Sequence, residues 1–585
     1  MNVLVLLGLA IGFFVLASKF YSNYLAGSLG IDPNRPTPAV RNQDGRDYVP
    51  TKLHVLFAHH FSAIAGAGPI VGPTMALLYG AVPGWLWIVL GGILIGAVHD
   101  FTSLFVSLQE NGKSIAKIAR TSLGKPGFVL FILFTITMIV LVTSSFLAAA
   151  ATSLTSQWPL SKLGLTSDTT FLRTTTNTQG EMLGVIGGIA STSVIVMTLL
   201  SPLMGYLIYK KKINIALAYL LAAVIMLGSV LIGIKYPIAI SAESWMLILS
   251  VYVLFAAGAP VWMILQPRDF INVQLLYGGI AALFLALLLG GFSGLSIQAP
   301  SFNLAEGAKN LGLVWPMLFI TIACGAISGF HSLITTGTSA KQLANEKEAR
   351  QVGYNGMLLE CTLAVCVLLA VGSGLAFADY QGIAWPETGA SNPILAFSLG
   401  VGYLLNKTFG LSVALGAVMG ILMVEGFVIT TLDVAVRLNR YLFEELWQAL
   451  AENVVPFLKN FWVNSGLAVI LMWFLAYSNT FSALWPIFGT ANQLLAALTL
   501  IAVSVWLYIR GKKNWFTVWP AVFMILTTVA SLVILLWNKY LPQKNYILIG
   551  MDLLLLVFAG GVAFLAVRTG LQLIRIKPVH KGAVS

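Results

Sequence analysis

Several ionisable side chains lie within stretches that are otherwise apolar, where a charge is costly and therefore marks a candidate functional residue. Imidazole titrates near neutral pH and a neighbouring carboxylate tunes that titration, so histidines grouped with carboxylates form a plausible proton relay. We expect the group at one depth in the membrane, although hydrogen bonding to a neighbouring helix is the alternative for any single member. The candidates for proton or ion coupling are His59, His60, His99, Asp100, His331, Glu360 and Glu425.

Two of these histidines, His60 and His99, form a candidate metal pair, because His and Asp are good ligands for zinc or manganese. The sequence has no HExxH, CxxC or HxxEH spacing that would fix a ligand geometry. The relay is therefore the main interpretation. We expect no required cofactor, and a divalent metal is an alternative.

A sodium ion is a second alternative to the proton. The hydroxyls of Ser332, Thr335 and Thr336 recur at i, i+3 and i+4, which places them on one face of a helix. Together with backbone carbonyls freed near Ile64 and Ala65, they could coordinate Na⁺. Hydrogen bonding of the hydroxyls to their own helix is the competing interpretation.

Two apolar stretches carry the same Gly and Pro pattern, AGAGP at 65–69 and AAGAP at 256–260. Such residues free backbone groups, which a membrane protein tolerates where the backbone faces protein or a water-filled cavity. A half-helix beginning there would present amides and its positive end to a carboxylate, whereas a kink for close packing is the alternative. The candidate substrate-binding residues are Gly66, Ala67, Gly68, Pro69, Ala257, Gly258 and Pro260.

The elements that must position these residues are transmembrane helices. Of the 585 residues, 58% are hydrophobic and 9% are charged, whereas soluble domains carry about 25% charged residues. This composition excludes a soluble enzyme, and the long continuous apolar stretches exclude a β-barrel. The net charge of +12 is typical of basic cytoplasmic loops, and no motif indicates nucleic acid. The three cysteines lie in apolar stretches, which predicts buried thiols.

We predict an all-α polytopic membrane protein with about 15 transmembrane spans, each needing roughly 20 apolar residues. The stretch 393–405 is shorter than that. The Lys and Arg residues sort to one side of the membrane only if this stretch does not cross. We therefore expect 393–405 to be a re-entrant or interfacial helix, with the N-terminus outside and the C-terminus in the cytoplasm.

The two patterned stretches begin on opposite sides of the membrane in this topology, five spans apart. That arrangement predicts a LeuT-like 5+5 inverted repeat with extra helices. The domains expected are 1–55 (first transmembrane helix and basic cytoplasmic loop), 56–234 (first five-helix repeat), 244–433 (second repeat) and 434–585 (amphipathic linker and four peripheral transmembrane helices).

Two further groups lie at the edge of this expected core. Asp433, Arg437 and Arg440 are placed at the inner boundary, where we interpret them as a solvated ion-pair edge. Asn492 and Gln493 belong to a span that falls outside the two repeats. By position they are peripheral, and they would either line a dimer contact or brace the core.

Five blocks of the sequence resemble the carbon starvation protein A family, and they follow the family's order over nearly the whole chain. HDF at 99–101 and GTSAKQ at 337–342 depart from the QDF and GTTPK expected there. The blocks are DGRDYVPTKLHVLFAHHFSAIAGAGPIVGP (44–73), GAISGFHSLITTGTSAK (325–341), YNGMLLE (354–360), TTLDVAVRLNRY (430–441) and LWPIFGTANQLLAA (484–497).

The resemblance implies a bacterial inner-membrane transporter of the amino acid–polyamine–organocation superfamily, associated with uptake of pyruvate or peptides and driven by protons. We therefore expect a carrier that imports a small carboxylate, pyruvate rather than peptide, by proton symport with alternating access. A peptide importer, a Na⁺-coupled carrier, a channel and a membrane sensor are the alternatives, in that order. The expected partners are the substrate, the lipid bilayer and, as an open alternative, further copies of the chain. An enzymatic activity is not expected.

Overall fold

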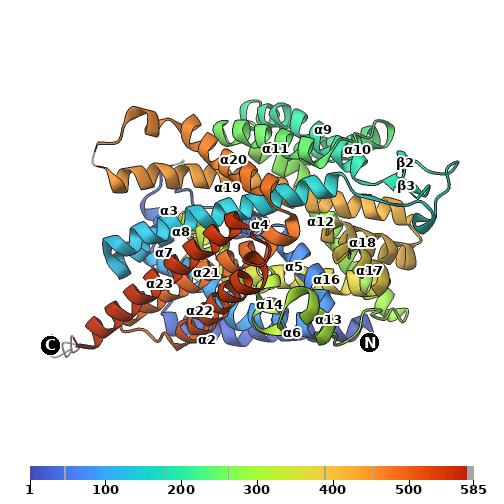
Figure 1. The fold of residues 1–585 in the computed structure, drawn as a ribbon. Helices are drawn as coiled ribbons and strands as arrows, with labels where there is room; N and C mark the ends of the chain where they lie inside the picture. Colours follow the sequence, from blue (N-terminus) through green and yellow to red (C-terminus); the bar gives the residue numbers. More distant parts are fainter. Residues whose placement is uncertain (45–47, 178, 261, 388–389, 452, 576–585) are drawn as a thin grey trace.

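The computed structural model describes residues 1–44, 48–177, 179–260, 262–387, 390–451 and 453–575. Three residues of the 44–73 block and the last ten residues of the chain therefore lie outside the described residues. Within the described ranges the chain is helical apart from one small sheet, as the composition predicts (Figure 1).

The first half of the described chain forms twelve α-helices. The longer of them are largely apolar, since a membrane-spanning segment must satisfy its backbone internally and present apolar side chains to lipid. They are α1 (Val3–Leu16), α2 (Ser22–Leu29), α3 (Pro38–Arg41), α4 (Leu53–Ile64), α5 (Gly68–Ala76), α6 (Ala81–Gly91), α7 (Ala97–Gln109), α8 (Ile115–Leu154), α9 (Gly187–Gly205), α10 (Ile215–Lys235), α11 (Ala242–Gly258) and α12 (Leu265–Phe292).

The second half contributes the remaining helices, several of which are joined to their neighbours by short 3₁₀ or π turns. They are α13 (Leu304–Leu311), α14 (Val314–Thr321), α15 (Phe330–Gly337), α16 (Gly356–Gly374), α17 (Phe377–Ala384), α18 (Pro393–Phe409), α19 (Val413–Leu450), α20 (Phe461–Ser478), α21 (Phe481–Ile509), α22 (Trp515–Leu535) and α23 (Tyr546–Arg575).

In the described residues, 12 helices are long and apolar enough to cross a membrane, or 13 if the bent pair α4–α5 is one span. Three of the predicted spans take other forms. The stretch 56–80 is the α4–α5 pair, bent by 48°, and 244–265 contains α11, which has only 17 residues. The stretch 313–337 is divided into α14 and α15, each of 8 residues.

The sheet lies in the long connection between α8 and α9. Its strands are β1 (Gln157–Pro159), β2 (Thr174–Thr176) and β3 (Met182–Val185), arranged antiparallel in the order β1-β3-β2. In Figure 1 the long α8 runs across the view and ends near this sheet and near α17 and α18. The sheet therefore marks one face of the molecule, the face that the charge distribution predicts to be outer.

Both ends of α18 lie at this same face. At its beginning, the side chain of Asn392 donates to the hydroxyl of Ser156 just after α8, 2.9 Å away. At its end, the ammonium of Lys407 donates to the carbonyl of Ser373 near the end of α16, 3.2 Å away. The helix over 393–405 is thus longer than predicted, and it enters and leaves on one side of the molecule.

The interior is built around α8, α19 and α21. The helix α8 packs on both α19 and α21, and α19 also packs on α18 and α20. The buried apolar side chains of these helices belong to one large core cluster, to which most other helices also contribute. The buried cysteines Cys324, Cys361 and Cys366 are free thiols. The same interior holds the two interrupted helices described next.

Candidate functional site

Two interrupted helices cross in the centre of the molecule. One interruption, 65–67, separates α4 from α5, and the other, 322–329, separates α14 from α15. A Cβ atom at Gly72 would lie 2.8 Å from the carbonyl oxygen of Thr321. Because glycine has no Cβ, it lets the two backbones approach this closely.

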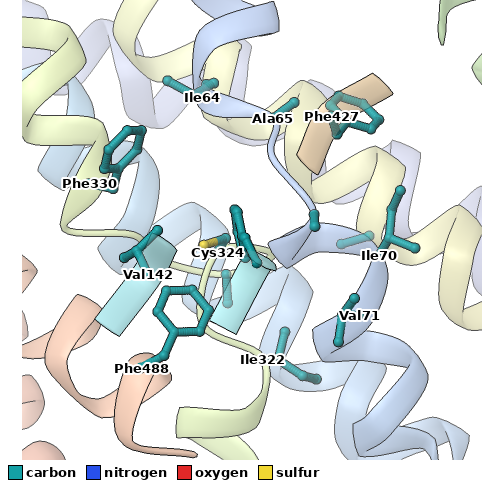
Figure 2. Packing of buried hydrophobic residues seen from close by; sticks show 14 of the residues in the cluster. Ile64, Ala65, Ile70, Val71, Val142, Ile322, Cys324, Phe330, Phe427 and Phe488 are labelled. Carbon is teal, nitrogen blue, oxygen red and sulfur yellow. The ribbon is translucent and has the colours of Figure 1, made fainter. Parts of the chain in front are cut away.

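The two interrupted segments run antiparallel through the crossing. Gly72 of the first segment faces Thr321 of the second. Gly68 precedes Gly72, but it faces Cys324, which follows Thr321. Figure 2 shows the first segment passing Cys324 and Ile322 of the second. Opposite directions bring four helix ends together: α5 and α15 begin at the crossing, and α4 and α14 end there. Freed amides and freed carbonyls therefore meet in one place.

The predicted second half of the pocket, AAGAP, is not what faces the first break. Gly258 lies at the end of α11, and a Cβ atom there would face Phe461 and Trp462. The carbonyls of Ala256 and Ala259 accept hydrogen bonds from the guanidinium of Arg437. Arginines are favourable at helix C-termini because they satisfy the last carbonyls and the dipole.

The remaining residues of that motif have similar surroundings. Arg440 donates to the carbonyl of Ala257 at 3.3 Å, and Pro260 is exposed. The segment thus ends a helix that packs on α19 and α20. The prediction that it lies opposite the first glycine-proline pattern is therefore wrong. The segment that does cross Gly66, Ala67, Gly68 and Pro69 is 322–329, whose sequence IACGAISG has no proline.

A row of four ionisable side chains lies at the crossing, and the sequence identified all four. Nδ1 of His99 lies 2.7 Å from Oδ1 of Asp100, and Nδ1 of His331 lies 2.8 Å from Oδ2 of the same carboxylate. Nε2 of His331 lies 3.2 Å from Oε2 of Glu360, within ion-pair distance. All four side chains are fully buried, so we call His99–Asp100–His331–Glu360 the buried relay.

His60 lies at the edge of the buried relay. Its Nδ1 is 2.8 Å from the hydroxyl of Ser339, and it is fully buried. Its Nε2 has no hydrogen-bond partner among the described residues, which leaves one ring nitrogen of a buried imidazole unsatisfied. A buried polar atom of this kind is uncommon and marks a place where a ligand or a proton can bind.

The hydroxyls considered for Na⁺ form hydrogen bonds with protein atoms. Ser332 donates to the carbonyl of Gly329 at 2.7 Å, and Thr336 donates to the carbonyl of Ser332 at 2.6 Å. The hydroxyl of Thr335 lies 2.9 Å from that of Ser103 on α7. The hydroxyls thus follow the pattern of back-bonding within a helix and tie α15 to α7.

Two of the predicted coupling residues lie elsewhere. The carboxylate of Glu425 accepts a hydrogen bond from Ser153, near the end of α8, and is fully buried there. His59 lines a cavity instead of joining the buried relay. Glu425 was expected in the inner half of the span 409–433. Its partner lies near the end of α8, so residue 425 is nearer the predicted outer face than that span implies.

The cavity that His59 lines lies beside the first break. It has a volume of about 150 Å³ and is bounded by α4, α15, α19 and the start of α12. Thr431 is one of its lining residues, and a Cβ atom at Gly66 would lie 3.3 Å from the hydroxyl of Thr431. The polar lining is supplied by His59, Ser62, Asp269, Thr338, Thr430 and Thr431.

Behind this cavity lies a second buried network, which the sequence did not reveal. Nη1 of Arg268 lies 2.6 Å from Oδ2 of Asp433, and Nη2 lies 3.0 Å from Oδ1 of Asp269. Tyr252 donates to the same Asp433 oxygen at 3.0 Å, and Thr430 donates to Asp269 at 2.9 Å. Asp433 is fully buried, so the expectation of a solvated ion-pair edge is wrong for this residue. The available signal was the Arg-Asp pair in the short segment between two apolar stretches.

Asn492 of α21 holds the second break in place. Its Oδ1 accepts from the amide of Phe330 at 2.9 Å, and its backbone carbonyl accepts from the amide of Gly329 at 3.1 Å. Its Nδ2 lies 3.2 Å from the sulfur of Cys324. Next to it, Gln493 donates to the carbonyl of Phe319 at 2.6 Å. Of the two roles considered for this pair, bracing the core is the one that these contacts support.

In the part of the chain that the structure describes, no three side chains of His, Cys, Asp or Glu are grouped so as to hold a metal ion. The two histidines considered as a metal pair have different partners. His60 bonds to Ser339, and His99 bonds to Asp100. The two histidines considered for a metal are thus each bonded to a different oxygen.

Comparison with known proteins gives the family. The sequence profile described as Carbon starvation protein CstA matches residues 2–388 and 386–531. The pyruvate/proton symporter BtsT of Escherichia coli (strain K12) is 32% identical over 92% of this chain and 82% of that protein. The peptide transporter CstA of Bacillus subtilis (strain 168) is 30% identical over 86% of this chain and 84% of that protein.

Among solved structures, a manganese transporter of Eremococcus coleocola aligns over 90% of this chain and 99% of its own, with 10% identity and a TM-score of 0.45. The profile and the sequence relatives span the helices that carry the crossing, the buried relay and Asn492. The chain is thus a multi-span membrane protein that belongs to the family of carbon starvation protein CstA.

Proposed function

We propose that this chain is a secondary active transporter of the bacterial inner membrane, which imports a small carboxylate, pyruvate first, by proton symport. The observation that carries the proposal is the fully buried relay at the crossing of two interrupted helices. The relatives support it by their names, since one is a pyruvate/proton symporter and the others are peptide transporters.

The substrate carboxylate would bind at the crossing. Helix N-termini attract anions through their free amides and the positive end of the dipole. Both α5 and α15 begin there, and Gly66 and Gly68 leave the backbone uncovered. The adjacent 150 Å³ cavity gives a small solute room next to these amides.

The proton would be carried by the buried relay. His331 lies between two carboxylates, so its imidazolium form is paired on both sides, while its neutral form leaves two buried carboxylates facing one imidazole. The relay joins α7, α15 and α16. If the two end states of the carrier hold these helices differently, the relay binds its proton with different affinity in each, which is all that coupling requires.

The alternating movement would follow the inverted repeat, with its halves assigned differently from the sequence expectation. We place α4–α5, α6–α7, α8, α11 and α12 in one half, and α14–α15, α16, α19, α20 and α21 in the other. Matching contacts support this: α8 packs on α11, α20 and α21, as α19 packs on α20, α11 and α12. The pair α9–α10 is then an insertion. The count of 15 crossing segments and the predicted orientation of the termini belong to the same proposal.

A short peptide is the second candidate substrate, and one residue favours it. Asp269 lines the cavity beside His59, and its side chain is 32% exposed. A carboxylate in that position can bind an ammonium group, which a peptide has and pyruvate lacks. Asp269 would then read the amino end of a substrate whose carboxylate lies at the crossing.

The test is uptake into proteoliposomes containing the purified protein. Radiolabelled pyruvate and a labelled dipeptide are compared under an imposed pH gradient and an imposed Na⁺ gradient. The proposal expects pyruvate to accumulate with the pH gradient, to ignore the Na⁺ gradient, and to resist competition by excess dipeptide. Dipeptide accumulation without a pyruvate signal, abolished by Asp269→Asn, would establish the second candidate instead. Uptake that equilibrates without accumulating would contradict secondary active transport.

A further inference from the structure

A second cavity lies at the face of the molecule that carries the sheet. Its volume is about 400 Å³, and it is enclosed by α13, the end of α17, the start of α21 and the turn that follows α22. Polar and cationic side chains make up much of its wall. They are Lys309, Asn310, Trp385, Asn538, Lys539 and Gln543.

Lys539 gives this cavity its charge. Its ammonium donates to the carbonyl of Ser482 at 2.8 Å, and it takes part in none of the ion pairs among the described residues. The side chain is largely withdrawn from solvent. An ammonium with donors to spare and no counter-ion, facing a cavity, attracts an anion.

The other charged groups near the cavity nearly cancel. Lys309 projects from α13 with 75% of its side chain exposed, and its ammonium lies 4.0 Å from the carboxylate of Glu306. Asn310 also donates to that carboxylate, at 3.0 Å. The rim of the cavity is therefore close to neutral, and Lys539 supplies the positive charge inside it.

The cavity lies between the crossing and the face that carries the sheet. Met75 and Met317 are lining residues, and they belong to α5 and α14, whose other ends are at the crossing. Since α5 rises about 1.5 Å per residue, the cavity and the crossing are separated by little more than one half-helix. The wall at Met75 is fixed, because its carbonyl accepts from Tyr380 at 3.1 Å and from Trp385 at 3.3 Å.

We propose that this cavity is a capture site for the carboxylate of the incoming solute, with the ammonium of Lys539 as its anion-binding group. The proposal rests on the proposed function for the identity of the solute, but the charge of the cavity does not depend on it. Loading at this site raises the concentration of an anion next to the crossing before the carrier changes state.

The first experiment measures the charge of the cavity without any transport. Asn538→Cys places a thiol on the exposed wall, and the native cysteines Cys324, Cys361 and Cys366 are buried. Whole cells are treated with an anionic or a cationic membrane-impermeant methanethiosulfonate reagent, and Thr175→Cys on β2 is the exposed reference. The ratio of anionic to cationic reaction rates should be at least severalfold higher at position 538 than at 175, and Lys539→Gln should abolish the excess.

Pyruvate at saturating concentration should slow the anionic reaction at position 538 and leave position 175 unchanged. Equal rate ratios at the two positions would overturn the capture site. A raised ratio without protection by pyruvate would also overturn it, since the cavity would be cationic but would not hold the solute.

The second experiment measures uptake. Lys539→Gln should raise the KM for pyruvate severalfold with little change in maximal rate, and Lys539→Arg should retain the wild-type KM within about twofold. The control is Lys544→Gln, which removes the same charge from an exposed position a few residues away. An unchanged KM for Lys539→Gln would refute the capture site and leave the proposed function standing. If the wild-type protein takes up no carboxylate, the proposed function fails, and the thiol experiment still decides the charge of the cavity.

Discussion

Asp100 and His331 lie 231 positions apart in the chain, yet a single carboxylate oxygen of Asp100 sits 2.8 Å from Nδ1 of His331 in the buried interior. The other oxygen of Asp100 holds His99. The carboxylate thus sets the orientation of two imidazoles at once, and the second nitrogen of His331 is free to face Glu360. Asp100 is therefore the side chain that links the two histidines.

Neutralising Asp100 should separate accumulation from exchange. With Asp100→Asn, His331 loses one of the two carboxylates that stabilise its imidazolium form, so pyruvate accumulation driven by a pH gradient should fall at least tenfold. Exchange of labelled for unlabelled pyruvate needs no net proton movement and should persist within a few fold. Glu425→Gln is the matched control, because Glu425 is equally buried but bonds to Ser153. Wild-type accumulation by Asp100→Asn would exclude the relay as the coupling site.

The crossing itself can be tested with a single methyl group. Gly68→Ala would place a Cβ atom on the side chain of Cys324, so uptake should drop by at least tenfold through displacement of one broken helix. Cys324→Gly removes the obstructing atoms and should restore part of the activity in the double variant. The control is Gly278→Ala on α12, where a Cβ atom meets nothing within 4 Å. If Gly68→Ala is as active as Gly278→Ala, the two breaks do not pack as described.

Replacing Asn492 should lower both the stability of the protein and its rate of uptake. Asn492→Ala leaves the buried amide of Phe330 without its side-chain acceptor, and an unsatisfied buried group costs about 1–3 kcal/mol. We expect a lower midpoint of thermal unfolding in detergent together with a large loss of uptake. Asn34→Ala, at an exposed position, should change neither quantity. A stable but inactive Asn492→Ala protein would instead place Asn492 among the groups that touch substrate.

The Arg268–Asp433 pair should behave as a buried ion pair. Arg268→Gln leaves the buried Asp433 without its cationic partner, at a cost of about 3–5 kcal/mol. Asp433→Asn leaves the buried guanidinium with the part-exposed Asp269 alone and should cost less. The double variant removes both charges, so its loss of stability should be smaller than the sum of the two single losses. Lys117→Gln is the comparison, because both side chains of the Lys117–Glu445 pair are exposed, at 55% and 36%, and such a pair should contribute about 1 kcal/mol or less. Additive losses in the cycle, measured by chemical unfolding, would show that the pair is not coupled.

The sequence identified the buried relay because ionisable residues inside apolar stretches are rare, and each one is conspicuous. It identified the first break for a similar reason, since Gly66, Gly68 and Pro69 interrupt an apolar run. The second break escaped because 322–329 is made of small residues without proline, a composition that also suits a continuous membrane helix. AAGAP was chosen instead because it carried the proline.

Other features could not be predicted because they depend on contacts between distant helices. The partner of Asp433 is Arg268, 165 positions away, and nothing in either local sequence indicates the other. The depth of Glu425 was judged from its place in the span 409–433, whereas its partner Ser153 lies near the end of α8. The span of Asn492 was judged by its place in the order of helices, whereas its role follows from its bonds to the start of α15.

The bonds of Asn492 also define which parts of the carrier can travel together. They tie α21 to the first residues of α15. Further along, Trp506 of α21 donates to Glu110, the residue after α7, at 2.9 Å. Since α15 and α7 are also joined by the bond between His331 and Asp100, we infer that the three helices move as one unit. On the proposed function, a proton bound at His331 would act on all three helices together, and the bonds of Asn492 to Cys324 and Ser328 extend this unit into the second break.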